Sequence, residues 1–182
     1  AWAPHIPLAK EKLAASPLQF GTALLCMGLG SILTMPLVGV AVSRFGSSRV
    51  MSVSAICATL AMLIPFAAAT LPAFALGLLL FGCAFGALDV AMNAHGFLLE
   101  RAMRRAIMSS FHGVYSVAGL VGGLLSAVLI QRIDEFNHGL ISVGICMLLL
   151  VFALPRLLPP SVDKGSIATI LSLPSRYTIG LG

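Results

Sequence analysis

Asp89 and Asn93 are the residues of this chain whose chemistry is hardest to explain by packing alone. Asp89 follows the uncharged stretch 50–88, and Asn93 lies four positions later, on the same face of a helix. A carboxylate inside a bilayer costs several kcal/mol unless it is protonated, paired or hydrated. Such an acid can take up and release protons, and a neighbouring amide can orient water or a solute. We therefore expect Asp89 and Asn93 to lie on a path for protons or substrate.

A second polar stripe lies on the next apolar segment. Ser109, His112 and Ser116 recur at spacings of three and four residues, which places them on one helical face. Because histidine titrates near neutral pH, His112 is a candidate for the same path. A histidine that is packed, or that faces a loop, would have the same sequence pattern.

Glycine pairs separated by four residues accompany both stripes, Gly82 with Gly86 and Gly119 with Gly123. In membranes this spacing allows two helices to approach closely. We expect these four glycines to serve helix packing.

The composition requires a bilayer around these residues. Of the 182 residues, 59% are hydrophobic and only 9% are charged, whereas soluble domains carry about 25% charged residues. The net charge of +5 is spread in short groups between apolar runs, which argues against a nucleic-acid surface. The four cysteines are scattered and indicate neither a disulfide framework nor a metal site.

The apolar runs are long enough to cross a bilayer as helices. Because lipid offers no hydrogen-bond partners, the backbone N–H and C=O groups of each span must bond within it, as they do in an α-helix. We expect spanning helices over 17–43, 50–69, 71–99, 106–131 and 136–155. Residues 1–8 resemble the end of an earlier helix, and 156–182 are expected to form a cytoplasmic linker. We thus expect an all-α membrane protein.

Orientation follows from the basic residues in alternate loops, because cytoplasmic loops carry the excess of lysine and arginine. One side carries eight of the 11 basic residues and the other side three. The eight are Arg44, Arg49, Arg101, Arg104, Arg105, Arg156, Lys164 and Arg176, and the three are Lys10, Lys12 and Arg132. The first side should therefore be cytoplasmic.

Two short segments resemble a known family. Gly39, Arg44, Gly46 and Arg49 match the signature loop between the second and third helices of the major facilitator superfamily. Ser43 stands where that loop usually has an aspartate that helps to latch the cytoplasmic face. Segments 88–94 and 108–113 resemble the fourth and fifth helices of the fucose-permease-like branch. The resemblance implies that Asp89 is linked to proton coupling and that Asn93 lies beside the transport path.

The resemblance implies a six-helix half-bundle, the N-terminal half of a carrier, with its first helix mostly missing. The expected function is proton-coupled transport of a small polar solute, a sugar by analogy, in a bacterial inner membrane. The expected partners are membrane lipid, a small-molecule substrate and the C-terminal half of the same carrier. No nucleic acid, metal or cofactor is expected. The alternatives are a non-transporting membrane subunit that docks partner helices through its glycine stripes and an intramembrane enzyme, which lacks any matched nucleophile and base.

Smaller expectations concern helix ends. Glu100 and Arg104 have the i to i+4 spacing of a helical ion pair. His5, His95 and His138 lie near predicted helix ends, where we expect them to meet the interface or solvent.

Overall fold

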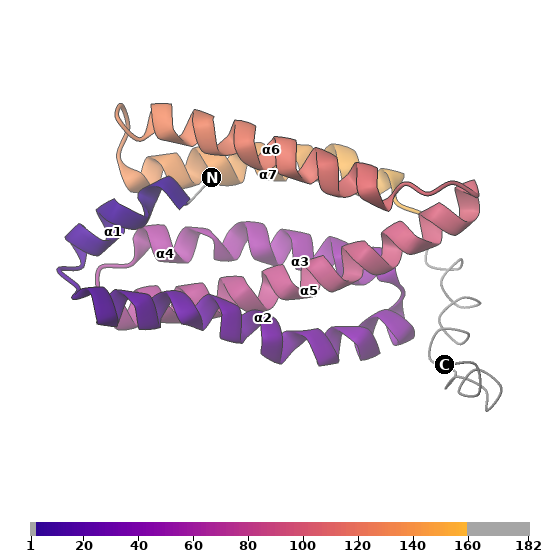
Figure 1. The fold of residues 1–182 in the computed structure, drawn as a ribbon, viewed down its shortest axis with the longest axis horizontal. Helices are drawn as coiled ribbons and strands as arrows, with labels where there is room; N and C mark the ends of the chain where they lie inside the picture. The colour runs from indigo at the N-terminus through magenta and orange to yellow at the C-terminus, as the bar shows by residue number, and fades with distance from the viewer. Residues whose placement is uncertain (1–2, 160–182) are drawn as a thin grey trace, which may run out of the picture.

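The computed structural model describes residues 3–159, and within them every regular element is a helix (Figure 1). The elements are η1 (Ala3–His5), α1 (Ile6–Lys12), α2 (Pro17–Phe45), α3 (Ser47–Ala61), α4 (Leu63–Ala67), α5 (Leu71–Met103), α6 (Met108–Leu129), α7 (Glu135–Ala153) and η2 (Leu154–Arg156). Within residues 3–159, five stretches are long and apolar enough to cross a membrane, with α3 and α4 forming one of them. The all-α membrane fold expected from the sequence is confirmed.

The helix bounds differ in detail from the expected ranges. The third span is divided at Met62 between α3 and α4, and α5 continues to Met103. The first segment, expected to end at residue 8, continues as α1 to Lys12. Of the expected linker, residues 160–182 lie outside the described part of the chain.

Side-chain caps begin three of the long helices. Before α2, Ser16 and Gln19 form a reciprocal capping box, in which each side chain accepts a hydrogen bond from the other residue's backbone N–H. Thr70 caps α5 and Asp134 caps α7. Because the first backbone N–H groups of a helix have no partner within it, these caps define where each span starts.

The connection between α2 and α3 consists of Gly46 alone. Its backbone has φ of 90° and ψ of 149°, a conformation that is open essentially only to glycine. The sequence predicted a longer loop over 44–49, but both helices continue up to this residue. A single glycine therefore reverses the chain.

The helices form a bundle (Figure 1). Helices α2, α3 and α5 pack closely together, α7 contacts α3 and α4, and α6 contacts η1 and α5, with α1 at one end of the bundle. We name the end that carries Arg44, Arg49, Arg104 and Arg156 the basic end, and the end that carries Lys12 and Glu135 the opposite end.

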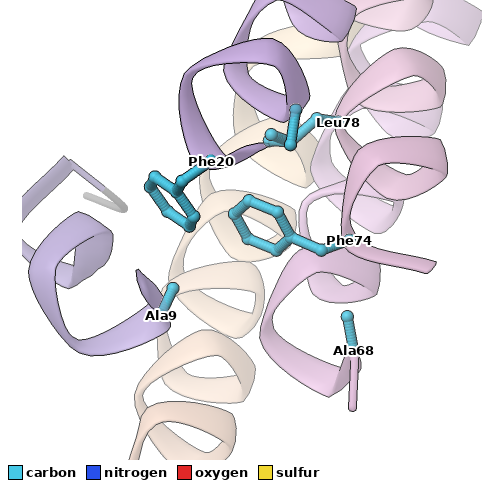
Figure 2. Packing of buried hydrophobic residues seen from close by; sticks show 6 residues of the cluster. Ala9, Phe20, Ala68, Phe74 and Leu78 are labelled. Carbon is cyan, nitrogen blue, oxygen red and sulfur yellow. The ribbon is translucent and has the colours of Figure 1, made fainter. Parts of the chain in front are cut away.

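The tightest core joins α1, α2 and α5 near the opposite end. Phe20 of α2 and Phe74 of α5 stack with ring centroids 5.4 Å apart, and Ala9, Ala68 and Leu78 close around them (Figure 2). A second buried cluster, Val38, Val42, Ala87 and Ala91, joins α2 to α5 toward the basic end. Helix α5 is thus packed against α2 at two places along its length.

The outer surface is apolar. Leu25, Leu33 and Leu37 of α2 are 66–69% exposed, and the exposed side chains of α6 include Val117 and Leu120. In water such a surface would aggregate, whereas hydrocarbon solvates it. These faces are suited to contact with lipid.

Candidate functional site

Asp89 lies near the middle of α5 and is half-buried. The side-chain amide of Asn93 donates to the backbone oxygen of Asp89 at 2.8 Å and lies 3.4 Å from its Oδ1. Within residues 3–159, the ion pair recorded is Lys12 with Glu135, and none involves Asp89. The carboxylate therefore has an amide donor but no fixed cation among the described residues.

A cleft of about 550 Å³ begins at Asn93 and extends toward the basic end. It lies between α5, α6 and the segment that follows α7. Its polar lining residues are Asn93, His95, His112, Tyr115 and Arg156, and apolar side chains such as Met92, Met108 and Phe111 form the rest. This volume and this mixture are typical of a site for a small ligand.

The cleft brings together two of the five predicted pathway residues, Asn93 and His112. Asp89 is one helical turn from Asn93 and contacts it directly. Ser109 and Ser116 are exposed on α6 and are not among the lining residues, and the Ser116 hydroxyl donates to the backbone oxygen of His112. The site is therefore centred on α5, with α6 contributing His112.

Sequence reasoning missed His95 and Arg156. His95 was expected near solvent, but it is only 7% exposed; its Nδ1 lies 2.9 Å from Ser47 Oγ, and its Nε2 accepts from the backbone N–H of Leu158 at 3.3 Å. Arg156 donates to the backbone oxygen of Phe152 and lines the same cleft. Met92, His95 and Gly96 lie at positions i, i+3 and i+4, so they share one face of the helix. This spacing was a sequence signal that could have drawn attention to His95.

The glycines of the two stripes have different surroundings. A Cβ at Gly82 would lie 2.1 Å from the backbone oxygen of Met27, and one at Gly86 would lie 2.7 Å from Ser31 Cα. These two glycines let α2 approach α5. Gly119 and Gly123 have no atom within 4 Å of the position of an added Cβ, so the packing expected there is not seen among the described residues.

The predicted signature loop is mostly helical. Gly39 lies inside α2, Arg44 places its guanidinium 5.5 Å from the ring centroid of Phe45, and Arg49 lies in the first turn of α3. Ser43, which stands at the aspartate position, donates to the backbone oxygen of Val40 at 2.8 Å. Its hydroxyl therefore contacts its own helix.

Glu100 has a different partner from the expected one. Its Oε1 accepts hydrogen bonds from the backbone N–H groups of Ile107 at 2.7 Å and Met108 at 3.2 Å. Arg104 ends α5 in the left-handed conformation, with φ of 51°. In place of the expected i to i+4 pair, the carboxylate caps the start of α6, where the helix dipole favours negative charge.

Comparison with known proteins identifies a family to which the chain is similar. The model of the Major Facilitator Superfamily matches residues 2–175. An uncharacterized MFS-type transporter of Yersinia pestis is 38% identical over 161 residues, which cover 87% of this chain and 41% of the relative. No solved structure matches the chain significantly.

Two further relatives come from Sinorhizobium fredii and Rhizobium meliloti. An uncharacterized transporter of Sinorhizobium fredii is 34% identical over 130 residues, 70% of this chain and 34% of its own length. The membrane protein MosC of Rhizobium meliloti is 36% identical over 126 residues, 69% of this chain and 31% of its own length. The chain therefore spans between 31% and 41% of the curated relatives that it matches.

Proposed function

Because this chain belongs to the major facilitator superfamily, a family of carriers and not of enzymes, we propose that its complete protein is a proton-coupled carrier of a small polar solute. The observation that supports the proposal best is Asp89, an acid near the middle of a spanning helix, with an amide beside it and no recorded cation partner among residues 3–159. The relatives named as transporters support the carrier function in general. A non-transporting subunit has no comparable support.

Asp89 is proposed to carry the coupled proton. An ionised carboxylate at this depth is costly without a cation, so it is stabilised by proton uptake or by water entering beside it. Each state has a different charge, and a change of charge at the site can be linked to a change of conformation. Asn93 keeps the carboxyl group oriented in either state, because its amide also bonds the helix backbone.

The solute is proposed to bind in the cleft next to Asn93. Amide, imidazole, phenol and guanidinium groups from Asn93, His112, Tyr115 and Arg156 line it, and these groups hydrogen-bond hydroxyl and carbonyl oxygens. A sugar or a similar polyhydroxy compound fits this lining. In this family the binding site lies between two halves of the carrier, so the C-terminal half is expected to supply the facing wall.

The bacterial relatives support an inner-membrane location. The basic end carries the α2–α3 turn, the α5–α6 turn and the segment after α7, and by the positive-inside rule it faces the cytoplasm. The cleft then opens toward the cytoplasmic side of Asp89.

The experiment that tests this function compares two transport modes of the complete protein in liposomes. Asp89→Asn keeps the shape of the side chain and removes its titration. We expect solute exchange across the membrane to persist and accumulation driven by a pH gradient to be lost. Asp134→Asn, at an exposed helix cap, is the matched control and should accumulate solute normally. Unchanged accumulation in Asp89→Asn would show that Asp89 is a structural polar group.

A further inference from the structure

Two histidines that are far apart in sequence form a buried hydrogen-bonded pair at the opposite end. His5 Nε2 lies 2.9 Å from His138 Nδ1, and His138 Nε2 lies 3.0 Å from Ser126 Oγ. His5, His138 and Ser126 are each at most 2% exposed. The sequence predicted that both histidines would meet the interface or solvent, and this prediction is wrong.

The pair joins three parts of the chain. His5 lies in η1, Ser126 near the end of α6, and His138 in the first turn of α7. All of α6 is described, and Ser126 is its buried residue. We call the three residues His5, Ser126 and His138 the clasp, because they connect the N-terminal segment to α6 and α7; the two helices and the turn between them are named the α6–α7 hairpin.

The surroundings of the clasp are mostly apolar. Phe66 of α4 packs edge-on against His5, with ring centroids 5.0 Å apart. A small cavity of about 20 Å³ adjoins His5 and is lined by Phe74, Leu78 and Phe81 of α5. The charged groups on that cavity are Lys12 of α1 and Glu135 of α7, which pair with each other at 3.3 Å.

The geometry limits how many protons the clasp can hold. A neutral imidazole has one N–H donor and one acceptor nitrogen, whereas a protonated one has two donors. With one of the two rings neutral, the contact between His5 Nε2 and His138 Nδ1 still has an acceptor. With both rings protonated it has none, and two positive charges face each other with ring centroids 4.3 Å apart.

We propose that the clasp is an acid-labile connection, closed while at least one of the two histidines is neutral and opened when both take up protons. Its opening separates η1 and α1 from the α6–α7 hairpin at the opposite end of the bundle. The clasp shares no residue with the proposed coupling site at Asp89, so it is a separate proton-sensitive element. Its consequence would be a change in the mobility of that end with pH.

Two carboxylates, Glu135 and Asp134, lie near the two histidines of the clasp. Glu135 is paired with Lys12. Hydrogen bonds from the backbone and side chain of Asn137 hold the pKa of Asp134 below its ordinary value, so this cap stays ionised in mild acid. Burial and the neighbouring His138 lower the pKa of His5 to about 4, so His5 gains its proton only in stronger acid, where carboxylates also titrate. A His5→Gln variant keeps both carboxylates and therefore separates their response from that of the histidine pair.

The test measures the distance between α1 and the α6–α7 turn in the complete protein in lipid nanodiscs. Spin labels replace Glu11 and Gln131, both exposed, after the native cysteines have been removed. At about pH 8 we expect a narrow distance distribution, and at about pH 3.5 a broader and longer one, because the lower value lies below the pKa of about 4 of His5. A wild-type distribution that stays the same at both pH values would overturn the proposal without any clasp variant.

His5→Gln separates titration from bonding. The glutamine amide can donate to His138 Nδ1 or accept from its protonated form, so the clasp bond survives in acid. We expect this variant to keep the narrow distribution at both pH values, and His5→Ala to show the broad one at both. His112→Gln, which removes a histidine outside the clasp, should respond to acid as the wild type does. Acid broadening in His5→Gln equal to that of the wild type would assign the response to other groups.

Discussion

The hydroxyl of Ser31 donates a hydrogen bond of 2.9 Å to the backbone oxygen of Gly82, across the interface between α2 and α5. Such a bond is possible because Gly82 has no side chain, and an added Cβ would lie 2.1 Å from the backbone oxygen of Met27. Gly30 makes the reciprocal approach from α2, where a Cβ would lie 2.3 Å from the oxygen of Leu79. Helix α5, which carries Asp89, is therefore positioned by backbone contact.

Gly82→Ala should destabilise the protein. The added methyl group meets backbone atoms that cannot rotate away, so the helices must separate, and overpacking of this kind costs about 1–3 kcal/mol or more. We expect a lower midpoint of thermal unfolding for the complete protein in detergent. Gly119→Ala is the matched control, since nothing lies within 4 Å of its Cβ position, and its midpoint should be unchanged or slightly raised. Equal midpoints for the two variants would contradict the close approach at Gly82.

Gly46→Ala should be destabilising for a different reason. The φ of 90° and ψ of 149° at Gly46 are strained for any residue with a Cβ, at a cost of about 1–3 kcal/mol. Gly39→Ala, inside α2 and with open space around its Cβ position, should be neutral or stabilising. The measurement is again thermal unfolding, and a Gly46→Ala protein as stable as Gly39→Ala would show that the turn adjusts without strain.

Glu100→Ala should loosen the start of α6. The variant removes the carboxylate that caps the N–H groups of Ile107 and Met108, and loss of a helix cap costs about 0.5–2 kcal/mol. We expect faster hydrogen exchange of the amides at 107 and 108, measured by mass spectrometry. Glu11→Ala, which removes an exposed carboxylate elsewhere, should leave this exchange unchanged. Equal exchange in the two variants would count against the cap.

The orientation can be tested with reporter fusions to the complete protein. Fusions after Ser47, Arg104 and Lys164 should give cytoplasmic signals, and a fusion after Asn137 should report the other side, because the basic loops remain in the cytoplasm. Periplasmic signals at any two of the first three positions would reverse the assignment.

The sequence by itself determined the solvent and the class of fold. Long uncharged runs are compatible only with hydrocarbon, and in hydrocarbon the backbone must satisfy itself within each span. Caps such as Ser16 and Thr70 lie next to the apolar runs that they begin, so local pattern also located the starts of α2 and α5. The family followed from short motifs, and the match over residues 2–175 supports it.

The tertiary structure decided which residues meet. Periodicity places residues on one face of a helix but does not say what that face contacts, so Gly82 and Gly119 had the same sequence pattern and have different surroundings. Arg104 lies one helical turn from Glu100 and could pair with it, but the Glu100 carboxylate instead accepts from the backbone N–H of Ile107, at the start of α6.

The clasp shows the same limit most clearly. His5 and His138 are 133 positions apart, and each alone resembles an ordinary histidine near a helix end. Their contact depends on how η1, α6 and α7 pack. A hydrophobic pattern shows that a segment is buried but not which other segments it packs against. The sequence therefore predicted where the chain is buried in lipid, whereas the packing of its helices selected the polar side chains that are buried together.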